Sequence, residues 1–141
     1  MNDQPTARSG DILVFLDMAI SLREERARAL GGGKIEVKSY GPGVVSLEGA
    51  IHLDGGALHE DEIAHIVLHD PESVLRLCAA ARKVIAAHPV TRDVIAVQPD
   101  GNHGFGCIVC HTEDLLTIGD GWCDTLLALA EGYGWTEGVT A

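Results

Sequence analysis

The sequence predicts an α+β fold with an N-terminal helix, a small antiparallel β-hairpin, a central helix pair, and a C-terminal zinc-knuckle-like tail with a short helix. Helical spacing of apolar residues over 11–30 and 58–88 predicts the helices, and alternation over 34–53 predicts the hairpin. A Cys-x-x-Cys pair with a third cysteine nearby marks the tail, 98–132. At 141 residues and 46% hydrophobic content, we expect a single domain over 1–141 whose core needs no disulfides.

The first predicted helix spans 11–30. Ser9 or Asp11 can cap its N-terminus, and three consecutive glycines, 31–33, are expected to end it. Its buried side should follow the helical spacing of Ile12, Phe15, Leu16, Ala19, Leu22 and Arg26.

The hairpin region, 34–53, alternates apolar and polar residues on both sides of the turn at 40–43, whose sequence is Tyr-Gly-Pro-Gly. Residues 51–53 could add a third short strand. The side chains expected to face inward are Ile35, Val37, Val45 and Leu47.

The central segment, 58–88, predicts two helices broken at Asp70 and Pro71, with Asp70 as the N-cap and Pro71 at the first helical position. In the first helix, one side carries Glu62, His65 and His69, and the other carries Ile63, Ile66 and Val67. The second helix should bury a stripe made of Val74, Leu77, Cys78, Ala81, Val84, Ile85 and His88. Within that stripe, Cys78 is expected to be a small core residue, and His88 to interact favourably with the helix C-terminus.

In the tail, 94–97 predicts a strand, 98–106 a loop, and 124–131 a helix that ends at Gly132. Cys107 and Cys110 have the two-residue gap of a zinc knuckle, and Cys123 stands just before the predicted helix, where exposed N–H groups stabilise a thiolate. Three close cysteines without a recognisable secretion signal favour a metal over a disulfide. We therefore expect a structural zinc ion in the tail.

Structural zinc needs four ligands, so a histidine should complete the three cysteines. The candidates are His65, His69, His88, His103 and His111. We favour His69, because it ends its helix beside the Asp70 cap in polar surroundings, and the predicted metal site is Cys107, Cys110, Cys123 and His69. Two alternatives are thiols without metal and c-type haem attachment at 107–111; haem would require export, for which the sequence carries no signal.

Charge and hydropathy limit the classes of function. The formal net charge of −11 opposes binding to nucleic acid, and the basic residues form no track that could follow phosphates. The sequence has neither a signal peptide nor an apolar run of the roughly 20 residues that span a bilayer. We expect a cytoplasmic protein that binds neither nucleic acid nor membrane; its oligomeric state stays open.

We expect an interaction module whose partner is another protein and whose zinc clamps the tail to the central helix. No catalytic residue and no cofactor beyond zinc is assigned, because the sequence lacks a phosphate-binding glycine loop, a nucleophile elbow and a convincing carboxylate pair. The first alternative is a small metal-dependent hydrolase, in which an open zinc position holds water and Glu62 or His65 acts as the base. The second is an acidic inhibitor that mimics DNA.

A family resemblance rests on two stretches. Residues 65–88 carry His-x-x-x-His-Asp-Pro-x-x-Val-Leu-Arg, and the tail carries Cys107-x-x-Cys110, then Cys-Asp-Thr-Leu from 123, with Tyr133 following. The chain resembles, over most of its length, the domain of unknown function 6221 found in small proteins of actinobacteria and their phages. Trp122 stands where the family pattern has proline, and Gly-Tyr-Gly at 132–134 replaces Pro-Tyr-Ala. The resemblance implies no activity, but its phage members suggest a protein that acts on a host protein.

Overall fold

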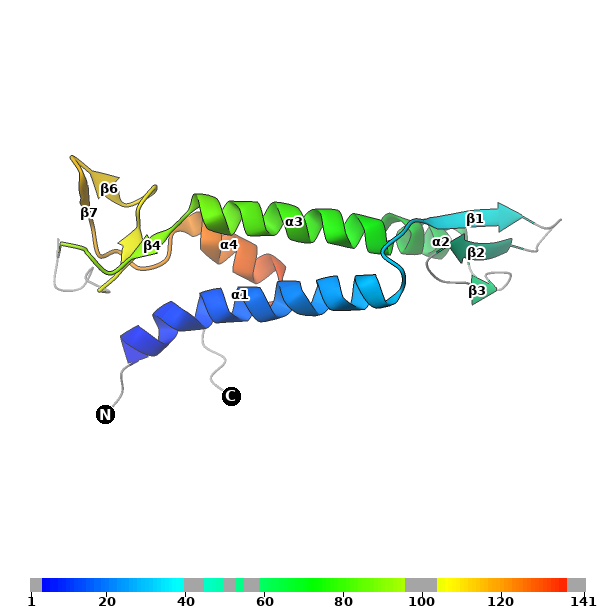
Figure 1. Cartoon of the computed structure of the whole chain (residues 1–141), viewed down its shortest axis with the longest axis horizontal. Coiled ribbons are helices and arrows are strands. Elements are labelled where there is room, and N and C mark those ends of the chain that lie inside the picture. The colour runs from blue at the N-terminus through cyan, green and yellow to red at the C-terminus, as the bar shows by residue number, and fades with distance from the viewer. Residues whose placement is uncertain (1–3, 40–44, 50–52, 55–58, 96–103, 137–141) are drawn as a thin grey trace. The chain divides into compact units, whose positions relative to one another are not determined.

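The computed structural model describes residues 4–39, 45–49, 53–54, 59–95 and 104–136. It has the mixed α+β composition that the sequence predicts (Figure 1). The chain divides into two compact units, one formed by 1–20 with 81–141 and the other by 21–80. The prediction of a single domain stays a prediction.

Helix α1 spans Gln4–Ala29 and begins earlier than expected. Ser9 and Asp11 therefore lie inside the helix and not at its N-cap. Its C-terminus agrees with the prediction, because Gly31 and Gly32 adopt positive φ angles of 91° and 68°, and their N–H groups donate to the last turn of the helix.

The unit formed by 21–80 contains a three-stranded antiparallel sheet. Its strands are β1 (Ile35–Ser39), β2 (Val45–Gly49) and β3 (Leu53–Asp54), in the order β1-β2-β3 (Figure 1). Ile35 pairs with Gly49, and Ser39 with Val45. The predicted hairpin is confirmed, whereas the turn at 40–43 and residues 51–52 lie outside the described residues.

Helices α2 (Glu60–Leu68) and α3 (Pro71–Ala87) are separated at the predicted position. Asp70 Oδ1 accepts a hydrogen bond of 2.8 Å from the Ser73 N–H, which confirms its role as N-cap. Its other oxygen, Oδ2, accepts a hydrogen bond of 3.1 Å from the Ile35 N–H at the start of β1. One buried carboxylate thus caps α3 and attaches the sheet to it.

The other unit contains the tail. After α3, strand β4 (Val90–Thr91) pairs with β5 (Gly106–Cys107), and β6 (Thr112–Glu113) pairs with β7 (Leu116–Thr117); α4 (Asp124–Gly132) follows (Figure 1). The expected strand at 94–97 is reduced to a bridge between Ile95 and Ile118, and 96–97 lie outside the described residues. The predicted short helix is confirmed.

The buried core of this unit contains Ile12, Leu16 and Ile20 from α1, Leu126 and Ala130 from α4, and Phe105, Cys107 and Cys123. Three residues expected inside are exposed: Leu22 at 47%, Val37 at 50% and Leu77 at 64%. In α1, Ile20 and Ala27 are buried instead, whereas Cys78 and Ala81 of α3 are buried as expected. No helix among the described residues is long and apolar enough to cross a membrane.

Candidate metal centre

Three cysteines and one histidine converge in the tail unit. The potential ligand atoms of His88, Cys107, Cys110 and Cys123 all lie within 4.8 Å of one another. The histidine is therefore His88, whereas the sequence prediction favoured His69.

Three of the four candidate ligands, His88, Cys107 and Cys123, lie at the ends of secondary-structure elements. His88 directly follows α3, and its N–H donates to the Ile85 carbonyl oxygen at 3.1 Å. Strand β4 begins two residues later and pairs antiparallel with β5, so that Val90 lies opposite Cys107. This pairing brings a residue at a helix end beside the first residue of the cysteine knuckle.

The knuckle turn is fixed by backbone hydrogen bonds. The Ile108 N–H donates to the Pro89 carbonyl oxygen at 2.9 Å, and the His111 N–H donates to that of Cys107 at 2.9 Å. In return, His111 Nδ1 accepts from the Cys107 N–H at 3.0 Å. His111 therefore stabilises the turn that presents the ligands.

Cys123 is the N-cap residue of α4 and makes no capping hydrogen bond with its side chain. Its sulfur is consequently directed to the cluster, while its carbonyl oxygen accepts from the Leu127 N–H at 3.1 Å. The sequence placed this cysteine at a helix start, and the structure confirms that position.

The distances match a tetrahedral metal site. His88 Nδ1 lies 3.7 Å from Cys107 Sγ, 3.5 Å from Cys110 Sγ and 3.8 Å from Cys123 Sγ. A tetrahedral zinc ion, with bonds of about 2.3 Å to sulfur and about 2.0–2.1 Å to nitrogen, separates these atoms by about 3.6 Å. One ring nitrogen has a single proton or lone pair, so it cannot form three good hydrogen bonds, but it can be one corner of a tetrahedron.

The proton equilibria of the thiols also favour a bound cation. Burial raises the pKa of Cys107, but hydrogen bonds from the Cys110 N–H, from the His88 ring and from the Val109 N–H lower it to about 7. Partial desolvation of the Cys110 thiol and its hydrogen bonds with the other two thiols raise its pKa to about 11. The Cys107 thiolate therefore forms easily, whereas a thiolate on Cys110 at this spacing would be favoured by a positive charge beside it.

The close packing around the centre leaves little space for backbone change. Phe105 and Trp122 contact each other edge to face, with ring centroids 4.9 Å apart. At Gly106, beside Cys107, an added Cβ would overlap the Ile118 carbonyl oxygen. Ile85, Val90 and Trp122 pack against the buried cluster of Cys107, Cys123 and Leu126.

Two other histidine candidates, His65 and His69, lie on α2 and at its C-cap. His69 and His65 contact each other edge to face on α2 and its C-cap, with ring centroids 4.4 Å apart. His103 lies outside the described residues. The sequence signal for His88 was its place at the end of a helix. Pro89 follows it and ends the helix, and the β-branched pair Val90-Thr91 then starts a strand.

The model of DUF6221, a family of unknown function, matches residues 9–134. The chain belongs to this family. A search of curated proteins and a search of solved structures gave no match. The DUF6221 match contains all four residues of the metal centre.

Proposed function

We propose that this DUF6221 protein is a zinc-dependent interaction module, in which a structural zinc ion holds a surface that binds another protein. The observation that carries the proposal is the equal spacing of three sulfurs around His88 Nδ1. Four protein ligands complete a tetrahedral shell, as in structural zinc sites.

The proposed binding surface is the knuckle face, defined by Ile108, Val109, Leu115 and Leu116. Their exposed fractions are 45%, 59%, 97% and 52%. The first two belong to the knuckle turn and the others to the β6–β7 hairpin, so all four depend on the segment that the metal would fix. Exposed apolar side chains that share one structural segment are typical of a protein-binding site.

Leu115 gives the strongest support for a binding role. Asp114 and Leu115 form the two-residue turn between β6 and β7, with φ angles of +50° and +66°, a combination that favours Asn and Gly. Leucine there costs backbone energy and gains nothing from burial in the free protein. A bound partner that covers the side chain would account for it.

The hydrolase alternative has less support. A catalytic zinc needs an open coordination position, whereas the four side chains that converge here could supply all four ligands of a tetrahedral ion. Glu62, the proposed base, accepts a hydrogen bond from the His59 N–H as part of the N-terminal cap of α2.

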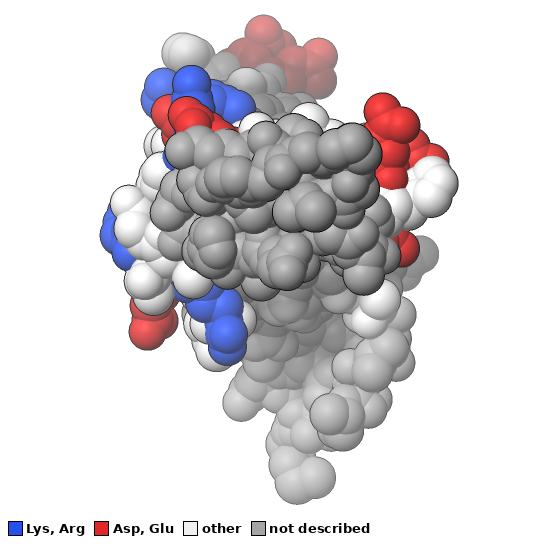
Figure 2. All heavy atoms as spheres, turned by 90° about the vertical axis from the view of Figure 1, so that its right-hand side faces the viewer, with Lys and Arg blue, Asp and Glu red and all other residues white. Residues whose placement is uncertain are grey.

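The DNA-mimic alternative would need a continuous acidic face. On the one face that Figure 2 draws, the visible acidic side chains lie in separate groups, with Lys and Arg side chains elsewhere on that face. We therefore propose that the net charge of −11 contributes to partner choice through electrostatic complementarity. We further propose, from the resemblance to phage proteins alone, a host protein in a bacterial cytoplasm as the partner.

Metal analysis tests the first part of the proposal. Purified protein should contain one zinc ion per chain, and Co²⁺ bound in its place should give the visible spectrum of tetrahedral thiolate coordination. A protein that binds neither ion stoichiometrically would contradict the zinc proposal.

Surface variants test the second part. Val109→Ser with Leu115→Ser should leave zinc content and thermal stability unchanged but reduce cross-linking to a partner by about tenfold. The control double variant is Leu68→Ser with Leu77→Ser. These residues lie on α2 and α3, outside the knuckle face, and their exposed fractions are 70% and 64%. Equal cross-linking by both double variants and the wild type would contradict a role of the knuckle face.

A further inference from the structure

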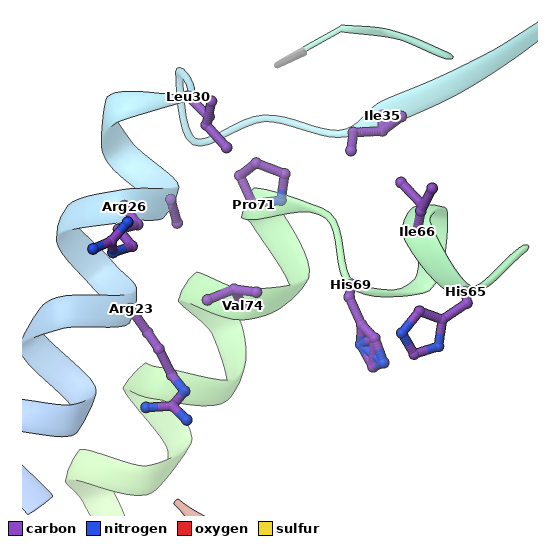
Figure 3. Close-up of a pocket in the computed structure, with 10 residues that line it drawn as sticks. Arg23, Arg26, Leu30, Ile35, His65, Ile66, His69, Pro71 and Val74 are labelled. Carbon is purple, nitrogen blue, oxygen red and sulfur yellow. The ribbon is translucent and has the colours of Figure 1, made fainter. Parts of the chain in front are cut away.

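The unit formed by 21–80 has a pocket of about 400 Å³, separate from the metal centre. Figure 3 shows residues of α1, β1, α2 and α3 around it. Its lining consists of Arg23, Arg26, Ala27, Leu30, Ile35, His65, Ile66, His69, Pro71 and Val74. This volume is in the range of pockets that bind small organic molecules.

The pocket combines an apolar base with a basic rim. The apolar part comes from Ala27, Leu30, Ile35, Ile66, Pro71 and Val74. The polar lining residues are two arginines and two histidines, and no Asp or Glu is among them. In a chain with 21 acidic residues and only 10 lysines and arginines, a lining with two arginines and no carboxylate complements a negative charge.

The basic groups come from two sides of the base. In Figure 3, Arg23 extends from α1 toward α3, while the rings of His65 and His69 lie together at α2. The two rings are in edge-to-face contact at 4.4 Å, which limits their rotation. The rim therefore offers arginine side chains on one side of the base and histidine rings on the other.

The base is held in place before any ligand binds. Ile35 is attached to the N-terminus of α3 by the bond between its N–H and Asp70 Oδ2, at 3.1 Å. The Glu72 N–H donates to the Gly33 carbonyl oxygen at 3.1 Å, which fixes the segment between α1 and β1 on the first turn of α3. Binding would therefore require little ordering of the backbone.

We propose that this pocket binds a small amphipathic anion, in which an apolar chain or ring covers the base and a carboxylate or phosphate contacts the rim. Arginine recognises either head group through paired hydrogen bonds. The pocket does not depend on the proposed zinc function, because every lining residue belongs to the other unit.

Calorimetry with chemically matched probes tests the proposal on the whole 141-residue chain as purified. Octanoate and octyl phosphate should bind at one site per chain, and the tighter of the two identifies the head group. Octanol, with the same chain but no charge, and acetate, with the charge but no chain, should bind at least about tenfold more weakly. Equal binding of octanol and octanoate would overturn the proposal.

Variants locate the site. Arg26→Gln and His69→Gln should each weaken binding of the preferred probe by about tenfold. The control, Arg28→Gln, removes an equal charge from the same helix at a residue that pairs with Glu24 and does not line the pocket. Val74→Glu, which places an acidic group at the base, should abolish binding while circular dichroism stays unchanged. Unchanged affinity in Arg26→Gln and Val74→Glu would also overturn the proposal.

Discussion

At the scale of single residues, the position of His88 decides the composition of the metal centre. The residue follows the last turn of α3, and its Nδ1 lies between 3.5 and 3.8 Å from three sulfurs. His69, in contrast, contacts His65 and lines a pocket. Mutation of His88 should therefore lower zinc affinity, whereas mutation of His69 should not.

His88→Ala should lower zinc affinity by at least about 100-fold. Removal of a ligand should cost more affinity than removal of a residue that only orients a ligand, which typically costs about 10–100-fold. His88→Cys should retain zinc, since four cysteines also form structural sites. Competition with a chromophoric chelator measures both affinities. His69→Ala is the matched control, and a zinc loss in that variant with retention in His88→Ala would contradict the assignment.

The ionisation of Asp70 should make the stability of the protein depend on pH. Burial acts to raise the pKa of its carboxyl group, but hydrogen bonds from the Ser73 N–H, the Ser73 hydroxyl and the Ile35 N–H, with the charge of Arg76, bring the pKa below its usual value. The carboxylate therefore stabilises the fold above the unfolded pKa of about 3.9, and this contribution is lost as the pH falls through the lower folded pKa.

Asp70→Asn should destabilise the protein by about 1–3 kcal/mol at pH 7, because the buried Ile35 N–H loses a charged acceptor. The stability gap to the wild type should stay constant from pH 7 to about 5 and narrow below about 4. Urea unfolding across this range measures the gap. A gap that widens in acid would contradict the role of the carboxylate.

At the scale of elements, the tail is built from two-residue strands whose partners are distant in sequence. The register of β4 with β5 places His88 beside Cys107, and Gly106 allows β5 to lie against the Ile118 carbonyl. A Cβ at residue 106 would overlap a backbone atom, so the backbone itself would have to move. A change of side-chain conformation could not relieve this overlap.

Gly106→Ala should destabilise the protein by about 1–3 kcal/mol, the usual cost of overpacking, and should also weaken zinc binding. Gly132→Ala is the control, because nothing lies within 4 Å of an added Cβ at the end of α4. That change should be neutral or stabilise by up to about 1 kcal/mol. Thermal unfolding of both variants distinguishes close packing at 106 from a general effect of removing glycine.

The helices and the hairpin could be predicted because their signals are local. Apolar periodicity, the Asp70-Pro71 cap and the glycines after α1 are contained in neighbouring residues. The early start of α1 was missed because the sequence offered cap residues at 9 and 11. The three cysteines were predicted from spacing alone.

The fourth ligand could not be predicted with the same reasoning. His88 is 19 residues from Cys107, and the pairing of β4 with β5 that joins them involves strands too short to show alternation. The burial of Ile20 and the exposure of Leu22 and Leu77 likewise depend on tertiary packing, which shifts the buried side of a helix from its most hydrophobic side.

At the scale of the whole molecule, all four candidate metal ligands belong to the unit of 1–20 and 81–141, and two of them, Cys107 and Cys123, are part of its buried core. Metal binding and folding of the tail should therefore be one equilibrium. The same ligands require deprotonation, so this equilibrium also depends on pH.

Chelation of the metal should remove hydrogen-exchange protection from 104–132 and leave α2 and the β1–β2 hairpin protected. Exchange followed by mass spectrometry compares the two regions. Equal loss of protection in both regions, or no loss in either, would contradict the proposal that the metal stabilises the tail.

Zinc affinity should fall as the pH is lowered from 8 to 6, by at least about tenfold per pH unit, because each thiol proton displaced by the metal adds one such factor. The pKa of about 7 for Cys107 and of about 11 for Cys110 means that protons must leave in this range. Affinity that does not change with pH would show that the thiols are not the ligands.

The unequal exposure of the three sulfur ligands has a kinetic consequence. Cys107 and Cys123 are 0% and 2% exposed, whereas Cys110 is exposed. All four candidate ligands would determine how tightly an ion is held, but a competing chelator would reach the centre first at Cys110. The lifetime of a bound ion should thus depend most on this one residue at the edge of the knuckle face.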